Sequence, residues 1–240
     1  MTDISQARKD ARMAGMLYLP IALIAPIGLM YVPGRLIVTG DAAATADRLR
    51  ASEWVLRLGI ASELSHQIIG IFLVLALYRL FKPVDEYQAR LLVILGLLLS
   101  LPIVFVNVLN EIAALILAGS AKYLAVFDRP QRDALAYLFL RLHGQGIQVA
   151  AIFWGLWLVP FGILVIRSRF IPRTLGVLLI VAGGAYLAAS FTSLVLPGYA
   201  STVIPLAQIL EVGELPIIVW LLIWGAKPQR DRVPPPGPAI

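Results

Sequence analysis

The sequence predicts an all-α membrane protein, a bundle of six transmembrane helices with an additional outer-side interfacial helix. Of its 240 residues, 60% are hydrophobic and 14% are charged, whereas soluble domains are about 45–50% apolar and about 25% charged. The apolar residues gather in six runs, each about as long as the roughly 20 residues that a helix needs to cross a bilayer. The runs lack the alternating pattern of membrane strands, and an open sheet cannot satisfy its backbone in lipid.

The six runs follow one another with short connections and use most of the chain. The predicted spans are about 13–33, 57–81, 90–119, 144–166, 174–196 and 204–225. We therefore expect one transmembrane domain over residues 1–226. The first run follows Arg8, Lys9 and Arg12 as the core of a signal peptide would, but it has the length of a full span, so we expect a retained helix.

Two of the connections contain helix signals. Asp41 is a capping residue, and the good helix formers of Ala42–Ala51 follow it. The segment Arg129–His143 mixes apolar and charged residues after Pro130, which fits either an amphipathic helix on the outer interface or an extension of the fourth span. Residues 227–240 are rich in proline, and we expect a disordered tail on the cytoplasmic side.

The distribution of Lys and Arg predicts the orientation. The N-terminal segment, the loops near 79–90 and 167–173 and the C-terminal tail carry twelve of them, and the opposite side carries eight. Positive charge accumulates on the cytoplasmic side, so we expect cytoplasmic N- and C-termini and a location in the inner (plasma) membrane. The net charge of +6 follows from these loops and indicates a lipid bilayer, not nucleic acid, as the partner. The sequence does not specify an oligomeric state.

A group of polar residues lies inside the apolar spans, in the half of each span nearer the predicted outer face. Charge at that depth costs a few kcal/mol per residue, so such residues are rarely there without a role. We expect the group to line a cavity open toward the outer face. It comprises Glu63, His66, Gln67, Asn107, Asn110, Glu111, His143, Gln148, Gln208, Glu211 and Glu214. The amides among them also suit hydrogen bonds between helices.

Charge balance makes a bound cation one of three solutions for the glutamates of this group. Four ionised glutamates would be unstable in low dielectric, so some of them must be protonated, paired or bound to a cation. Arg57 and Arg141 are the only basic residues near enough to pair with them. Cysteine is absent, so a metal needs carboxylate and imidazole ligands, which suit zinc, iron or manganese. The candidate metal ligands are Glu63, His66, Glu111, His143, Glu211 and Glu214. Glu63-x-x-His66 is half of a di-iron motif, and the second half is missing.

Several stretches resemble a bacterial multi-pass membrane family, domain of unknown function 4386. The resemblance is carried by ARMAGMLYL at 11–19, RLIVTGDAAATA at 35–46, LYRLFKPV at 77–84, Leu142-His143-Gly144, and LGVLL at 175–179. It implies a helical membrane bundle. Among the candidate site residues it transfers only His143, and it implies no particular activity.

Three functions fit these observations. The first is a metal-dependent membrane enzyme, a hydrolase or oxidoreductase acting on a lipophilic substrate. The second is a proton- or cation-coupled transporter of small molecules. The third is a non-catalytic membrane protein that binds a lipophilic or small polar ligand, or a partner. Walker-type and GxGxxG motifs are missing, which argues against ATP-driven transport by this chain alone.

Overall fold

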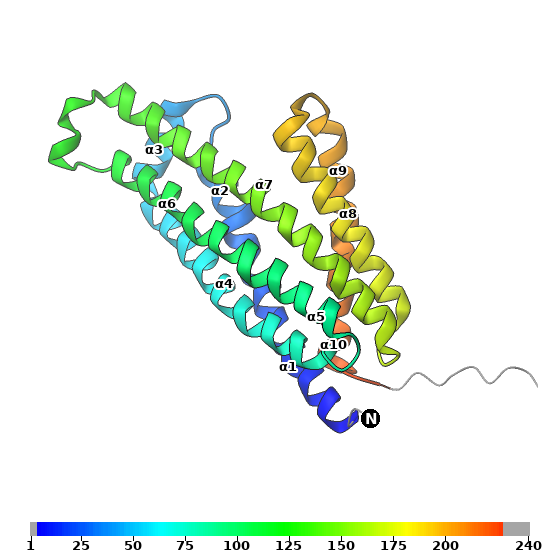
Figure 1. Cartoon of the computed structure of the whole chain (residues 1–240). Helices are drawn as coiled ribbons and strands as arrows, with labels where there is room; N and C mark the ends of the chain where they lie inside the picture. The colour runs from blue at the N-terminus through cyan, green and yellow to red at the C-terminus, as the bar shows by residue number, and fades with distance from the viewer. Residues whose placement is uncertain (1–3, 228–240) are drawn as a thin grey trace, which may run out of the picture.

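The chain folds as a bundle of long helices (Figure 1). The computed structural model describes residues 4–227, and this part contains helices and turns but no strand. The predicted all-α fold class is confirmed. The helices are α1 (Ile4–Pro26), α2 (Val32–Leu36), α3 (Ala42–Ala51), α4 (Glu53–Phe81), α5 (Glu86–Val93), α6 (Leu101–Ala118), α7 (Arg129–Ser168), α8 (Arg173–Val195), α9 (Ala200–Glu211) and α10 (Leu215–Ile223).

Within residues 4–227, six helical stretches are long and apolar enough to cross a membrane. They are Ser5–Leu36, Glu53–Phe81, Glu86–Ala118, Arg129–Ser168, Arg173–Val195 and Pro197–Ile223. Three of them join two α-helices through a turn of different pitch. The π-helical turns Ile27–Tyr31 and Ile94–Ser100 join α1 to α2 and α5 to α6, and the 3₁₀ turn Val212–Glu214 joins α9 to α10. The predicted tail, apart from Lys227, lies outside the described residues.

The two helix signals in the connections have different outcomes. Ala42–Ala51 forms the separate helix α3, and the Asp41 side chain accepts the Ala44 N–H at 2.9 Å. Arg129–His143 belongs to the continuous 40-residue helix α7, so this segment extends the fourth span. A capping box between Asp128 and Gln131 starts α7, and it satisfies two backbone donors at the helix N-terminus.

An ion-pair network fixes α3 against the first turns of α7. Arg50 donates two hydrogen bonds to Asp133, at 2.6 and 3.2 Å, and a third to Asp47 at 2.8 Å. Asp47 also pairs with Arg129 at 2.8 Å. The bond to Asp133 raises the pKa of Arg50 above its ordinary value, and the bond from Arg50 lowers the pKa of Asp47. The bidentate geometry orients α3 as well as holding it.

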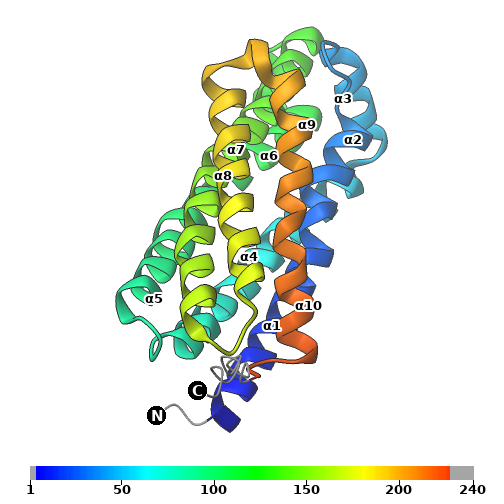
Figure 2. The same cartoon turned by 90° about the vertical axis from the view of Figure 1, so that its right-hand side faces the viewer.

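The start of α1 and the end of α10 lie at one end of the bundle, and α3 lies at the other (Figure 2). Arg12 donates to the carbonyl of Ile223 at 3.4 Å. We call these the terminal end and the α3 end. The connections between α4 and α5 and between α7 and α8 are also at the terminal end (Figure 1).

Two apolar cores lie along the bundle, with a polar layer between them. The core at the terminal end includes Leu77, Leu80, Phe81, Phe161, Leu164 and Leu221. The core at the α3 end includes Leu36, Leu49, Leu56, Ala114 and Leu140. Along α4, Glu63 lies between Leu56 of one core and Leu77 of the other. Glu111 of α6 and His143 of α7 lie beside Glu63, and Asn107 of α6 bonds to the His143 carbonyl, so the fold gathers these polar residues into one layer.

Glycines bring α7 and α8 into close backbone contact. A Cβ added at Gly155 would lie 2.6 Å from the Gly183 carbonyl oxygen, and one at Gly162 would lie 2.5 Å from that of Gly176. Since lipid gives no hydrophobic driving force between helices, such close packing is a main source of their association. This contact fixes the position of α8 beside the polar layer.

A candidate metal centre and an adjacent cavity

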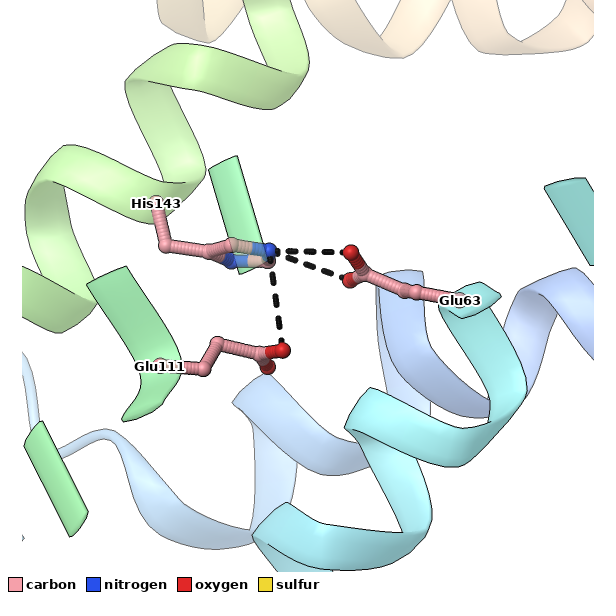
Figure 3. Close-up of side chains that lie close together, drawn as sticks. All are labelled: Glu63, Glu111 and His143. Carbon is pink, nitrogen blue, oxygen red and sulfur yellow. Dashed lines mark hydrogen bonds and ion pairs between the residues drawn. The ribbon is translucent and has the colours of Figure 1, made fainter. Parts of the chain in front are cut away.

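Three buried side chains from three helices meet in the polar layer (Figure 3). Glu63 comes from α4, Glu111 from α6 and His143 from α7. The Nε2 atom of His143 lies 3.1 Å from both carboxylate oxygens of Glu63 and 3.9 Å from Oε2 of Glu111. One donor atom from each residue lies within 4.8 Å of the other two. We call these residues the Glu-Glu-His cluster.

The Nε2 atom of His143 forms its hydrogen bond with Oε2 of Glu63, which leaves two other carboxylate oxygens of the cluster without a donor. Within the described part of the chain, Oε1 of Glu63 and Oε2 of Glu111 are buried without a hydrogen-bond partner. The Glu63 and Glu111 side chains are 0% and 3% exposed. A buried acceptor left unpaired costs about 1–3 kcal/mol, and more if it is charged. The cluster therefore needs a proton or a cation for these oxygens.

Two amide side chains on α6 form a hydrogen-bonded chain that ends on the backbone of His143. Asn107 donates through Nδ2 to the His143 carbonyl at 2.9 Å, and Asn110 donates to Oδ1 of Asn107 at 2.9 Å. Gly146 makes room for this pair, because a Cβ there would lie 2.0 Å from Oδ1 of Asn107. These bonds fix the backbone that carries the His143 ring.

The π-helical turn of the first span packs against the Glu63 side of the cluster. A Cβ at Gly28 would lie 2.9 Å from Cγ of Glu63, so a glycine lets the turn approach closely. The Ser62 hydroxyl accepts the Gly28 N–H at 3.3 Å and donates to the Ile24 carbonyl at 2.7 Å. The Ser62 hydroxyl thus gives a hydrogen bond to a backbone carbonyl next to the point where the first span changes from α-helical to π-helical pitch.

His66 lies one turn from Glu63 on α4 but is not part of the cluster. Its Nδ1 lies 3.0 Å from the Ser62 carbonyl and its Nε2 lies 3.1 Å from Nε2 of Gln67. Since a carbonyl accepts and an amide nitrogen donates, these contacts correspond to a neutral ring with the proton on Nδ1. Both ring nitrogens of His66 thus have partners, whereas His143 faces two carboxylates.

Glu214 borders a separate cavity of about 180 Å³. The hydroxyl of Tyr18 donates to Oε1 of Glu214, and that of Tyr186 lies 3.5 Å from Oε2. His66 and Gln67 also line this cavity. We call it the tyrosine–glutamate cavity. It and the Glu-Glu-His cluster divide most of the predicted site residues between them.

A second cavity, of about 300 Å³, borders the π-helical turn of the first span at Gly28 and Leu29. His143, Gly144 and Gln148 line it, so it reaches one member of the Glu-Glu-His cluster. We call it the His143 cavity. Leu29 borders both this cavity and the tyrosine–glutamate cavity, so a single side chain lies where the two approach each other.

Comparison with protein-family models assigns the chain to a family. A family model described as Domain of unknown function (DUF4386) matches residues 13–225. The chain belongs to this family. The resemblance seen in its sequence motifs is thereby confirmed. Comparisons with curated proteins and with solved structures found no match.

The remaining predicted residues of this DUF4386 chain lie outside both sites. Gln208 is exposed on α9, and Glu211 is partly buried without bordering either cavity described above. Arg57 pairs with Glu53 at 2.5 Å on the surface, and not with the glutamates of the cluster or the cavity. Arg141 does border the His143 cavity.

No sequence signal singles out Tyr18 and Tyr186, which line the tyrosine–glutamate cavity together with Trp154 and Trp157. Aromatic residues in a membrane span commonly anchor it at the interface. Nothing in their spacing indicates a shared carboxylate, since Tyr18 and Glu214 are 196 residues apart. Only the docking of α10 against α1 brings them together.

Proposed function

We propose that this DUF4386 protein is a membrane enzyme that binds one divalent metal ion at Glu63, Glu111 and His143. One observation carries the proposal: two buried carboxylate oxygens without hydrogen-bond partners lie beside an imidazole nitrogen. A cation between the three groups would give both oxygens a partner at once.

The distances support a single ion. Ligand atoms at about 2.0–2.2 Å from a tetrahedral zinc lie roughly 3.3–3.6 Å from one another. The contacts of the His143 nitrogen, at 3.1 Å to Glu63 and 3.9 Å to Glu111, bracket that separation. All three ligand atoms lie within 4.8 Å of one another, so the two carboxylates would turn toward the ion to complete the geometry.

Charge and ligand type support a transition metal. Two carboxylates and a neutral imidazole carry the charge that one divalent cation neutralises, so the burial penalty falls. Mixed oxygen and nitrogen donors suit zinc, iron or manganese. The neighbouring Asn107 donates to the His143 carbonyl and so holds the backbone that carries this ligand.

Three protein ligands favour a catalytic over a structural role, because catalytic zinc sites keep one position open. The His143 cavity supplies space beside that position. A metal ion bound by Glu63, Glu111 and His143 would supply a Lewis acid. A site inside the helix bundle suits a lipophilic substrate. We propose metal-assisted hydrolysis as the reaction class.

The decisive experiment is the metal content of the purified protein by mass spectrometry. The wild type is compared with Glu111→Gln and His143→Gln, and with the matched controls Glu214→Gln and His66→Gln. We expect about one ion per chain in the wild type and both controls, and at least about 100-fold weaker binding in the two cluster variants. Metal-free, well-folded wild type that takes up none of the three metals would refute the proposal.

The enzymatic part has its own test. Hydrolysis of 4-nitrophenyl esters with short and long acyl chains is measured in lipid nanodiscs. A Cβ at Gly144 meets no atom within 4 Å, so Gly144→Leu should fill the His143 cavity without disturbing the fold. We expect this variant to retain metal and lose hydrolysis. Equal hydrolysis by wild type and His143→Gln would show that the cluster does not perform it.

Proton- or cation-coupled transport is the second candidate. It is supported by Leu29, which borders both cavities and would separate two halves of a path. Uptake of zinc or protons into proteoliposomes that is abolished by Glu111→Gln would favour transport. A protein that binds metal, but neither transports nor hydrolyses, fits the non-catalytic alternative.

We also propose a single transmembrane domain in the inner membrane with both termini in the cytoplasm. The excess of Lys and Arg in the segments of the terminal end supports this orientation. The chain has no cysteine, so single cysteines can be introduced at Ser5 and at Ser120 without background. A membrane-impermeant maleimide applied to intact cells should label only the Ser120→Cys variant, and the opposite pattern would reverse the orientation.

A further inference from the structure

The tyrosine–glutamate cavity is a distinct feature that a metal at the Glu-Glu-His cluster does not explain. It lies between the first span, α4, the stretch Glu86–Ala118, α7, α8 and the turn before α10. Its wall is mostly apolar and aromatic, and its polar lining residues include His66, Gln67, Ser100 and Glu214. Four of the lining residues are aromatic: Tyr18, Trp154, Trp157 and Tyr186.

The aromatic residues form two pairs, one for each oxygen of Glu214. Tyr18 packs edge-on against Trp157, with ring centroids 6.2 Å apart, and Tyr186 packs edge-on against Trp154 at 6.4 Å. Each tyrosine directs its hydroxyl at the carboxylate. The tyrosines therefore hold Glu214 in place, and each of them packs against a tryptophan of the cavity wall.

The carboxylate of Glu214 has no cationic partner in this wall. Neither Lys nor Arg is among the residues that line the cavity, and the two contacts of His66 correspond to a neutral ring. Each carboxylate oxygen has two acceptor positions, and one tyrosine uses only one of them. The site thus retains capacity for a donor that also carries positive charge.

We infer that the tyrosine–glutamate cavity binds a lipophilic amine, with its ammonium group on Glu214 and its apolar body between the aromatic side chains. A carboxylate supplies the ion pair, and the faces of aromatic rings attract cations. A neutral or anionic ligand would leave the first of these attractions unused.

The size of the cavity limits the ligand. A buried apolar cavity of about 150 Å³ holds one benzene ring, so the 180 Å³ here suits a single ring or short alkyl body with a small ammonium head. 2-Phenylethylamine matches this description. Its neutral analogue 2-phenylethanol has nearly the same shape, so the two compounds differ mainly in charge.

The test measures saturable binding of tritiated 2-phenylethylamine to the protein in lipid nanodiscs, with empty nanodiscs subtracted. We expect Glu214→Gln to weaken binding at least about tenfold, and 2-phenylethanol to compete at least about tenfold less well than the unlabelled amine. Equal competition by the alcohol, or wild-type affinity in Glu214→Gln, would overturn the inference. Absence of saturable binding by the wild type would do the same.

If Glu214→Gln does not fold, a variant that fills the cavity tests the binding site instead. Gly70 lines the cavity, and a Cβ there meets no atom within 4 Å, so Gly70→Leu should fill the space and abolish binding. Gly184→Leu is the matched control, because Gly184 also faces open space but lies outside the cavity wall. Wild-type binding by Gly70→Leu would refute the site.

The inference is independent of the proposed enzyme. Glu111→Gln should lose metal and retain amine binding, whereas Gly70→Leu should lose amine binding and retain metal. If Glu111→Gln also loses the amine while folded, the carboxylate that anchors it belongs to the Glu-Glu-His cluster and the assignment to Glu214 is wrong.

Discussion

The Glu-Glu-His cluster and the tyrosine–glutamate cavity contain the same kind of group in two opposite settings. In the cluster, Glu63 and Glu111 each have a buried oxygen without a hydrogen-bond partner, and the side chains are packed tightly. In the cavity, the oxygens of Glu214 face two tyrosine hydroxyls, and empty space adjoins them.

This difference indicates what each carboxylate is arranged to do. Carboxylate oxygens without a donor are destabilised until a cation or proton arrives, so they favour a small ion that several ligands share. A carboxylate fixed by hydroxyl donors already has its orientation, and the space beside it admits a larger ligand. Burial alone therefore does not identify a metal ligand, whereas the count of donors around each oxygen discriminates.

Metal removal should give the largest difference between the two regions. Binding at about 1,000 times the dissociation constant stabilises a protein by about 4 kcal/mol. We expect a chelator to lower the melting temperature of the wild type and of Glu214→Gln, and to leave Glu111→Gln unchanged. An equal decrease in all three would place the stabilising metal elsewhere.

An added methyl group should destabilise the protein beside the Glu-Glu-His cluster but not in the tyrosine–glutamate cavity. Gly146→Ala forces Asn107 away from the His143 carbonyl, since the added Cβ would lie 2.0 Å from Oδ1, and overpacking of this kind costs about 1–3 kcal/mol. Gly70→Ala adds the same group where no atom lies within 4 Å and should stabilise α4 slightly. Thermal unfolding in detergent measures both, and equal effects would contradict the packing difference.

Neutralising a carboxylate should have opposite signs in the two regions when metal is absent. Glu111→Gln replaces a buried carboxyl group whose Oε2 has no donor, so we expect about 1 kcal/mol of added stability. Glu214→Gln weakens the hydrogen bonds from two tyrosines and should cost about 1–2 kcal/mol. Both values come from thermal unfolding in excess chelator, and a shared sign would show that donors do not distinguish the sites.

The two tyrosines of the cavity should contribute unequally. The Tyr18 hydroxyl bonds closely to Glu214, whereas that of Tyr186 lies at the 3.5 Å limit. We expect Tyr18→Phe to lower stability by about 1 kcal/mol and Tyr186→Phe by less than about 0.5 kcal/mol. The reverse order in unfolding experiments would show that Tyr186 is the main partner.

Much of the fold could be predicted because each helix carries its own signals. The long apolar runs predict spans, and Asp41 and Asp128 cap the helices that follow them. The π-helical turns were not predicted, because no local pattern in Ile27–Tyr31 or Ile94–Ser100 distinguishes a π turn from an α turn. Yet the first of these turns is where Gly28 meets Glu63.

The candidate site could be predicted as a set of residues but not as an arrangement. Glu63 and His66 are three positions apart, which places them on one helix face but about 60° apart around the axis. That angle is enough to point Glu63 at α6 and α7 and His66 toward the cavity. Gln208 shows the same limit, because its residue type fits a buried role and its place on α9 exposes it.

The sequence by itself determined the membrane class, the approximate positions of the six apolar spans and the set of polar groups within them, since these depend on local hydrophobicity and length. The tertiary structure decided which groups meet. Helix rotation joined His143, not His66, to Glu63 and Glu111, and the docking of α10 on α1 joined Glu214 to Tyr18. Rotation and docking depend on contacts between helices, such as Gly155 against Gly183, and a contact of that kind belongs to two distant segments at once.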